Sequence, residues 1–230
     1  MPWVLGIETA TDLLSIGIAT ENGVAAERSV RGRRLHSVRL LPFIKDLLVD
    51  SGISVKNLSG IGVSTGPGSF TGLRLGLITA KTLAEVLHIP VVGISTLLVM
   101  ATPLLPGALP VCPILTSRKE EVYAAVYQAD GEKVETMIPP FAASPPKVLE
   151  KLNTFSKVIV VGEGKQFLRK DRTFPLDNAI VLAPDFLDYP QGSVVAALAL
   201  KEMAARRPAD HLRLKPEYLR PPAITGGFKC

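Results

Sequence analysis

The sequence predicts an α/β protein of two lobes, in which one unit of three strands, a helix, a strand and a helix is used twice. Three observations support this prediction. Apolar segments of strand length alternate with segments of helical periodicity, landmarks in the two halves recur at one fixed offset, and a proline-rich stretch separates the halves. The chain has 230 residues, 47% of them hydrophobic, which is enough for a buried core in each half.

The first half opens with three expected strands. Trp3–Glu8 and Leu14–Ala19 are apolar, and Val24–Val30 follows Asn22-Gly23, a hairpin pair in which both residues tolerate positive φ. Leucine and isoleucine then recur at helical spacing up to Gly52, and Pro42 within this pattern indicates a kink or a helix start. The expected unit is completed by strand Leu58–Ser64, a glycine-rich loop, helix Leu73–Leu87, strand Val91–Ile94 and helix Thr96–Ala101.

The second half repeats this order. The turn glycines Gly23 and Gly131 lie 131 − 23 = 108 residues apart, and the helix starts His36 and Ser144 lie 144 − 36 = 108 apart. The expected elements are strands Val111–Thr116, Glu121–Tyr127, Lys133–Ile138 and Lys157–Val161, and helices Ser144–Leu152 and Val194–Arg206. We therefore expect a first lobe over residues 1–102, a linker over 103–110, and a smaller second lobe over 111–230 whose terminal segment returns to the first lobe.

The duplicated layout is that of the actin-like fold, which is shared by sugar kinases and heat-shock ATPases and is related to ribonuclease H. In that fold the hairpin after each first strand binds phosphate or metal, and phosphoryl transfer requires carboxylates there. The first hairpin offers Glu8 and Asp12, whereas the second offers Thr116 in place of Glu8, since 8 + 108 = 116. A stand-alone ATPase or phosphotransferase that uses Glu8 and Asp12 is therefore the alternative interpretation, and Thr116 argues against it.

Other kinds of chemistry find no supporting pattern. The histidines His36, His88 and His211 form no i, i+4 pair, so no metal site is expected. The run Gly66–Phe70 does not match a nucleophile elbow, so no catalytic residue is expected. No apolar run reaches the roughly 18 residues of a membrane span. The two unpatterned cysteines, Cys112 and Cys230, indicate a reducing compartment, most simply the cytoplasm.

The run Gly66–Arg74 is the most informative stretch of the chain. Its glycines and proline force a sharp turn out of a strand, and the start of the following helix exposes backbone N–H groups that can bind an anion. The carboxylate and hydroxyls of the first hairpin belong to the same expected site. Contacts to an anion or a nucleotide are therefore predicted for Glu8, Thr9, Thr11, Gly66, Gly68, Ser69 and Thr71.

The helix after this loop has a small residue at every fourth position, Gly72, Gly76, Ala80 and Ala84. Such a stripe lets another helix approach closely, and glycine inside a helix costs about 1 kcal/mol relative to alanine, so the stripe needs a packing reason. The pattern leaves open whether the stripe meets the chain's own first helix or another subunit. The opposite face, with Leu75, Ile78 and Leu83, is expected to serve the lobe's own core.

Several runs resemble the TsaB family, also known as YeaZ. The matching pieces are Ile7–Thr11, His36-Ser37 with Leu40–Pro42, Gly66–Arg74 with Gly76, Ala80-Lys81 and Leu83-Ala84, Ile89–Ser95, Arg118–Tyr123 and Pro216–Arg220. They cover the first lobe densely and the second lobe thinly. Glu8 stands where many members have aspartate, a difference that keeps the carboxylate.

The resemblance implies a non-catalytic subunit in the formation of tRNA threonylcarbamoyladenosine. Its partner would be TsaD, a paralogue that carries the transferase chemistry, with the ATPase TsaE joining them and tRNA reached through the complex. No cofactor is expected to bind tightly, and ATP or ADP, if bound, is expected at the interface with partners. Members alone form homodimers through the first-lobe helices, a surface for which TsaD competes. Here this surface corresponds to His36, Leu40, Leu41, Ile44, Gly72, Arg74, Gly76, Ala80 and Ala84.

Overall fold

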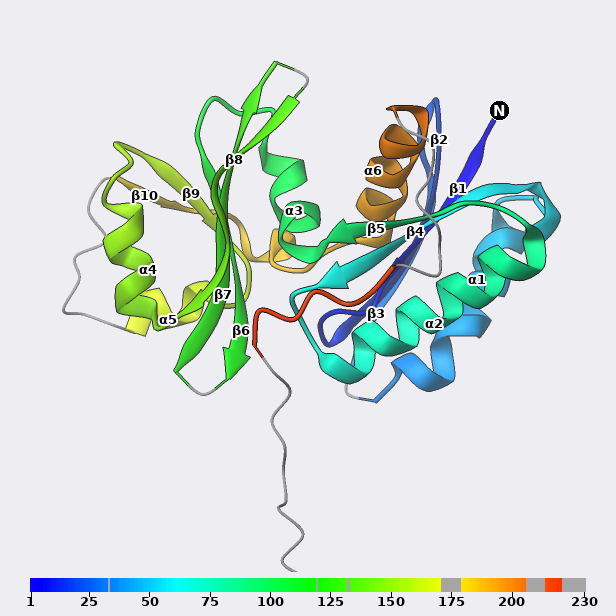
Figure 1. Cartoon of the computed structure of the whole chain (residues 1–230), viewed down its shortest axis with the longest axis horizontal. Coiled ribbons are helices and arrows are strands. Elements are labelled where there is room, and N and C mark those ends of the chain that lie inside the picture. Colours follow the sequence, from blue (N-terminus) through cyan, green and yellow to red (C-terminus); the bar gives the residue numbers. More distant parts are fainter. Residues whose placement is uncertain (33, 119, 132, 171–178, 206–213, 221–230) are drawn as a thin grey trace, which may run out of the picture.

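The computed structural model describes residues 1–32, 34–118, 120–131, 133–170, 179–205 and 214–220. This part of the chain forms two five-stranded mixed sheets with helices on both faces of each (Figure 1). His211, Cys230 and the expected helix end at Arg206 lie outside the described residues. Among the helices of these ranges, none has the length and apolar composition that crossing a membrane requires.

The first sheet has the strand order β3-β2-β1-β4-β5. Its strands are β1 (Trp3–Glu8), β2 (Leu13–Thr20), β3 (Gly23–Arg31), β4 (Leu58–Gly66) and β5 (Val91–Ser95). The β2–β3 hairpin turns at Gly23 with φ of 109°, as the Asn22-Gly23 pair predicts. Helices α1 (His36–Asp50) and α2 (Phe70–Leu87) cover its outer face, and η1 (Val55–Asn57) precedes β4. Pro42 lies inside α1, which begins six residues before it.

The second sheet repeats this arrangement with the order β8-β7-β6-β9-β10, so the prediction of a two-lobed actin-like fold is confirmed. Its strands are β6 (Val111–Arg118), β7 (Glu121–Asp130), β8 (Lys133–Ala143), β9 (Val158–Val161) and β10 (Ile180–Leu182). The remaining helices are α3 (Thr96–Ala101), η2 (Thr102–Leu104), α4 (Pro145–Leu152), α5 (Lys165–Lys170), η3 (Asp185–Leu187) and α6 (Gly192–Ala205). The three-residue β10 was not predicted, because it is too short to show an alternating pattern.

The last helix of each unit lies between the two sheets (Figure 1). α3 follows the first sheet and packs on β6 and β7 of the second sheet as well as on β4 and β5, and α6 follows the second sheet but packs on β1 and β2. Glycines allow the close approach of α6: a Cβ at Gly6 would collide with the carbonyl of Gly192, and a Cβ at Gly17 with the backbone of Ser193. The exchange of these helices binds the two lobes together.

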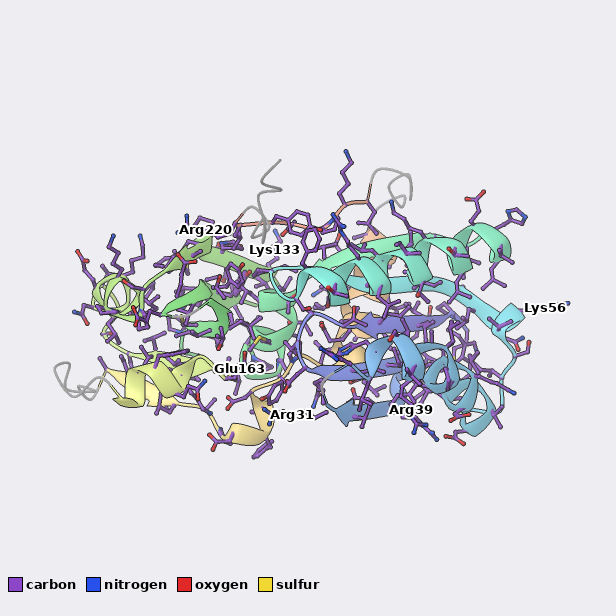
Figure 2. All side chains as sticks on the ribbon, turned by 90° about the horizontal axis from the view of Figure 1, so that it is seen from below. Arg31, Arg39, Lys56, Lys133, Glu163 and Arg220 are labelled. Atoms are coloured by element: carbon purple, nitrogen blue, oxygen red, sulfur yellow. The ribbon has the colours of Figure 1, made fainter. Side chains whose placement is uncertain are left out.

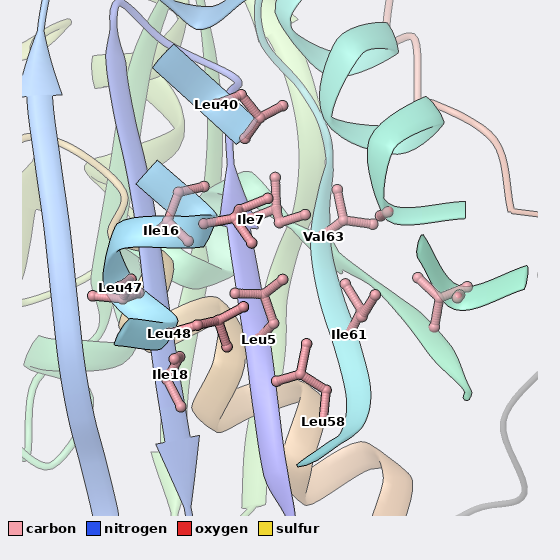
Figure 3. Close-up of a cluster of buried hydrophobic side chains, with 14 of the residues drawn as sticks. Leu5, Ile7, Ile16, Ile18, Leu40, Leu47, Leu48, Leu58, Ile61 and Val63 are labelled. Carbon is pink, nitrogen blue, oxygen red and sulfur yellow. The ribbon is translucent and has the colours of Figure 1, made fainter. Parts of the chain in front are cut away.

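The main core lies between the first sheet and the helices α1 and α2 (Figure 3). Leu5 and Ile7 alternate with Val4 and Gly6 along β1, so the former pair faces α1 and α2 while the latter faces α6. Leu40 and Leu47 of α1 complete this layer. Since full burial of a leucine or isoleucine stabilises by about 1.5–3 kcal/mol, the layer fixes how both helices are rotated.

Candidate docking surface and interlobe cleft

The small-residue stripe of α2 faces the chain's own first sheet. A Cβ at Gly76 would collide with the hydroxyl of Thr9, and a Cβ at Gly72 with the Thr9 carbonyl. The Thr9 hydroxyl also donates a hydrogen bond of 2.9 Å to the carbonyl oxygen of Gly72. The stripe therefore lets the end of β1 reach the helix backbone. Gly72 and Gly76 therefore serve the contact with Thr9, which the sequence did not suggest, while Ala80 and Ala84 lie in the core that the lobe shares with α1.

This orientation corrects most of the predicted interface. Six of its nine residues are buried within the lobe, namely Leu40, Ile44, Gly72, Gly76, Ala80 and Ala84. His36 is half-buried at the start of α1, next to the cleft between the lobes. Only Leu41 and Arg74 are exposed on the outer side of the helices.

The outer faces of α1 and α2 carry large apolar side chains in solvent. Val38, Leu41 and Val49 on α1 and Ile78 and Val86 on α2 are each between 61% and 70% exposed. On α2 they lie opposite the buried residues, as do Val38 and Val49 on α1, whereas Leu41 stands at the edge of the buried face, two turns before Leu48. The two helices lie side by side on the outside of the first lobe (Figure 1). Exposed apolar side chains gathered in this way are typical of a surface that another protein covers.

Of these five residues, the sequence predicted only Leu41 in an interface. It assigned Ile78 to the core and missed the other three, Val38, Val49 and Val86. The signal was present, since Val38, Leu41 and Val49 follow a helical spacing of their own. Leu75 and Leu83 do pack against the core from half-buried positions, as expected. The core side of α2 carries both the small stripe and Leu73 and Leu77, so size alone did not identify the outer face.

A cleft of about 880 Å³ lies between the lobes. The first lobe contributes the β1–β2 hairpin and the starts of α1 and α2, and the second lobe contributes Leu115–Ser117, Tyr123 and Glu163. Of the residues predicted to contact an anion or a nucleotide, four line this cleft, namely Thr11, Gly68, Ser69 and Thr71. The Ser69 hydroxyl accepts a hydrogen bond from the N–H of Gly72, so it caps α2 as expected for this position.

Glu8, Thr9 and Gly66 do not line the cleft, which corrects their predicted role as contacts. The Glu8 carboxyl is fully buried, where it accepts a 2.6 Å hydrogen bond from the N–H of Ala10 and another from the Ser64 hydroxyl. Burial raises the pKa of Glu8 to about 7, although these hydrogen bonds oppose the rise. The carboxyl thus joins the ends of β1 and β4 inside the lobe and does not reach a ligand in the cleft.

The cleft has one carboxylate from each lobe, Asp12 and Glu163. Glu163 comes from the loop after β9 and was missed, because the comparison by offset considered only the hairpins. Asp12 forms an ion pair with Arg31, with 3.0 Å between Oδ2 and Nε. The Arg31 guanidinium also lies 4.6 Å from the ring centre of Tyr189. Figure 2 shows Arg31 and Glu163 at the junction of the lobes. Within the described residues no three His, Cys, Asp or Glu side chains gather in a group that could bind a metal ion.

The starts of α1 and α2 bring polar groups to the cleft. His36 is partly desolvated there, which lowers its pKa, while hydrogen bonds to the backbone of Thr11 and Leu13 oppose the change. In the described part of the chain, the Nε2 atom of His36 and the Oδ1 atom of Asp12 are buried without a hydrogen-bond partner. The cleft therefore offers a polar surface, but it does not bring two carboxylates together at the hairpins as nucleotide hydrolysis in this fold would need.

The chain is similar in sequence to proteins that act in the modification of tRNA. A family model described as TsaD, tRNA N6-adenosine threonylcarbamoyltransferase, matches residues 21–223. The chain is 34% identical to a tRNA threonylcarbamoyladenosine biosynthesis protein TsaB of Escherichia coli over 79% of its own length and 81% of that protein. It is 31% identical to TsaB of Bacillus subtilis over 94% of its length and 93% of that protein.

The chain belongs to the TsaB family. The fold is also that of a solved structure, YeaZ from Pseudomonas aeruginosa, which superposes with a TM-score of 0.81 at 24% identity and covers 95% of this chain and all of that one. A more distant likeness in fold alone is component A of (R)-2-hydroxyglutaryl-CoA dehydratase from Acidaminococcus fermentans, with a TM-score of 0.51 at 11% identity. The resemblance to TsaB found in the sequence is therefore confirmed. These likenesses extend over both lobes.

Proposed function

We propose that this TsaB-family chain is a docking subunit without a catalytic site of its own in the formation of threonylcarbamoyladenosine on tRNA. Its partner would be the TsaD transferase, bound to the outer faces of α1 and α2. The observation that carries the proposal is the row of exposed apolar side chains on these helices, which includes Leu41 and Val86. Covering such residues on association would be favourable, at about 25 cal/mol per Å² of apolar surface.

Three features support a non-catalytic role. Of the two carboxylates of the alternative ATPase interpretation, Glu8 is buried away from the cleft, and Asp12, which lines it, is paired with Arg31. Thr116, which the 108-residue offset makes the counterpart of Glu8, lines the cleft from the second lobe and carries no carboxylate. The described residues contain no group of His, Cys, Asp or Glu side chains that could hold a metal ion. No observation favours a stand-alone ATPase or phosphotransferase.

The other partners follow from the same proposal. The outer faces of α1 and α2 would meet their own copies in a homodimer when TsaD is absent, since a two-fold axis places the same patch on both sides. TsaE would join the TsaB–TsaD pair, and tRNA would be reached through the complex in the cytoplasm. No cofactor would bind tightly to this chain, and ATP or ADP would bind at the interface with the partners.

Reconstitution tests the proposal. Transfer of threonylcarbamoyl to tRNA would be measured with TsaD and TsaE of the same organism, with this chain absent, present, or present as the double variant Val38→Asp/Leu41→Asp. We expect activity to require this chain, and the double variant to lower it at least tenfold at limiting concentration. Val134→Asp, an exposed apolar position on β8, is the matched control and should behave as wild type.

The controls separate the two parts of the proposal. The chain alone should neither modify tRNA nor hydrolyse ATP above background. Turnover by the chain alone would contradict the non-catalytic role, whereas a double variant as active as Val134→Asp would contradict the docking surface. Circular dichroism and melting temperature would show that each variant is folded.

A further inference from the structure

A second cavity, of about 530 Å³, lies between α2 and the extended segment Leu214–Arg220. Its floor is mostly aliphatic and its rim is cationic. The floor is built by Leu77, Ile78, Leu214 and Pro216, and the rim by Arg74, Lys81, Lys215 and the ring of Tyr218. None of these lining residues carries a carboxylate. We call this cavity the α2 groove.

The extended segment is anchored to the first sheet at Leu214 and Glu217. The N–H of Glu217 donates a hydrogen bond of 2.7 Å to the carbonyl oxygen of Thr65 at the end of β4. Two glycines make room for the segment: a Cβ at Gly66 would lie 2.7 Å from the carbonyl oxygen of Glu217, and a Cβ at Gly93 would collide with Leu214. One wall of the α2 groove is therefore fixed by the sheet itself.

Aromatic and charged contacts fix the far end of the segment. The rings of Tyr218 and Phe70 stack with centres 5.0 Å apart, and the Arg74 guanidinium lies 3.7 Å from the centre of the Phe70 ring. Arg74 Nε donates to the Tyr218 hydroxyl over 3.4 Å, and Arg220 pairs with Glu121 of β7 over 2.6 Å. The α2 groove is thus formed before any partner arrives, which lowers the ordering cost of binding.

We propose that the α2 groove binds a segment of a protein partner in which a large apolar side chain is flanked by carboxylates. An apolar floor takes the side chain, and the cations of Arg74, Lys81 and Lys215 attract the flanking acids. The inference rests on the proposed function, because Arg74 and Ile78 also belong to the outer face of α2, so the segment would come from the docked TsaD transferase.

The lining favours a peptide over RNA. Proteins that bind single-stranded nucleic acid offer aromatic rings on which bases stack. Here the floor is aliphatic, and the one aromatic ring of the groove, that of Tyr218, already stacks on Phe70 with one of its faces. Ile78 also lies one helical turn after Arg74 and is 64% exposed, so the floor continues directly onto the docking face of α2.

Two variants test the groove without disturbing its walls. Lys215→Glu reverses an exposed rim charge, and Ile78→Ala truncates the exposed part of the floor. Lys133→Glu on β8 of the second lobe makes the same change in net charge and is the matched control. Affinity for the TsaD transferase of the same organism would be measured by calorimetry at low salt and in about 0.5 M salt. The higher concentration screens attraction between exposed charges.

We expect Lys215→Glu to weaken binding about tenfold at low salt and less at high salt, because a rim charge acts through screened attraction. Ile78→Ala should weaken binding by a similar factor at both salt concentrations. Lys133→Glu should bind as wild type. Melting temperatures would confirm folding, and if Ile78→Ala fails to fold, the salt-dependent loss of Lys215→Glu decides alone.

Each other outcome overturns the inference. If Lys215→Glu, which lies off α1 and α2, binds like Lys133→Glu while Val38→Asp/Leu41→Asp loses binding, the groove is wrong and the proposed function stands. If none of these variants weakens binding, both the α2 groove and the docking surface of the proposed function are wrong. A Lys215→Glu variant that loses affinity only for a tRNA anticodon stem-loop would make the groove an RNA site. A change in self-association alone would make the occupant a second copy of this chain.

Discussion

Helices α1 and α4 occupy the same place in the two copies of the unit but differ on their outer sides. The buried pairs correspond, since 40 + 108 = 148 relates Leu40 to Val148 and 44 + 108 = 152 relates Ile44 to Leu152. The exposed apolar residues do not correspond: beside charged residues such as Arg39, α1 shows Val38, Leu41 and Val49 to solvent, whereas α4 shows Lys147, Glu150 and Lys151 and no large apolar side chain. The fold itself requires only the buried pairs. The apolar outer side of α1 therefore points to a requirement outside the fold, which we propose is a partner.

The ends of the first strands differ in a similar way. Glu8 ends β1 inside the lobe with a raised pKa, whereas Thr116 near the end of β6 lines the cleft. The ends of β1 and β6 therefore do not present a facing pair of carboxylates to the cleft. Glu8 and Thr116 thus hold the same position in the duplicated pattern, but only the side chain of Thr116 reaches the cleft.

The largest expected effect lies on the inner side of α2. Gly76→Val would push two methyl groups into the space of Thr9, so the free energy of unfolding should fall by about 3 kcal/mol or more. Chemical denaturation would measure it. An unchanged free energy of unfolding would mean that Gly76 does not lie against Thr9. It would contradict the assignment of the small-residue stripe to the buried side of α2.

A smaller effect concerns Glu8 and its dependence on pH. Its pKa is about 7 in the folded chain and 4.5 when unfolded, so its contribution is fully present below pH 4.5 and is lost as the pH rises through about 7. The loss should be on the order of 3 kcal/mol. Glu8→Gln should remove this dependence and leave the variant more stable than wild type at pH 8.

Denaturation of both proteins between pH 4 and pH 8 measures the Glu8 effect. Thr116→Val in the second lobe is a comparison in which no titrating group changes, and it should keep the wild-type slope. Parallel curves for wild type and Glu8→Gln would contradict the raised pKa of the buried carboxyl.

The outer side of α2 should respond in binding and not in stability. Val86→Asp places a charge among the exposed apolar residues, so it should weaken affinity for the TsaD transferase at least tenfold, or about 1.4 kcal/mol, while the melting temperature stays near that of wild type. Calorimetry and thermal denaturation would be run side by side. If Val86→Asp lost stability but not affinity, Val86 would contribute to the packing of the lobe and not to binding of the partner.

The smallest expected effect lies on α4. Lys147→Asp changes the charge of the exposed side of the equivalent helix, and affinity for the transferase should stay within about twofold of wild type, because surface substitutions away from an interface usually change little. The same binding assay measures it. A loss as large as that of Val86→Asp would show that both lobes dock the partner.

Most of the fold could be predicted because its signals are local. The turn pairs Asn22-Gly23 and Asp130-Gly131 predicted both hairpins, and the common offset predicted the order of strands and helices along the second half, apart from β10. The exchange of α3 and α6 between the lobes could not be foreseen, since it depends on the match of Gly6 and Gly17 with the backbone of α6. Sequence periodicity identifies a buried face but not the sheet that buries it.

The site was predicted less well, for a related reason. The stripe of α2 was recognised, but whether small residues serve a neighbouring strand or another subunit depends on where Thr9 lies in space. Glu163 reaches the cleft from a loop of the second lobe, and the extended segment around Tyr218 forms the α2 groove across a long separation in sequence. These arrangements depend on tertiary contacts that leave no local pattern.

Hydroxyl-radical footprinting of this chain, free and bound to the TsaD transferase, tests the central claim most directly. Exposed apolar side chains react, and a partner that covers them protects them. We predict that Leu41, Val49, Ile78 and Val86 lose most of their reactivity in the complex, while Met137 and Phe186, which are exposed on the second lobe, keep theirs. Protection of Met137 and Phe186 with unchanged reactivity on α1 and α2 would contradict the proposed docking surface.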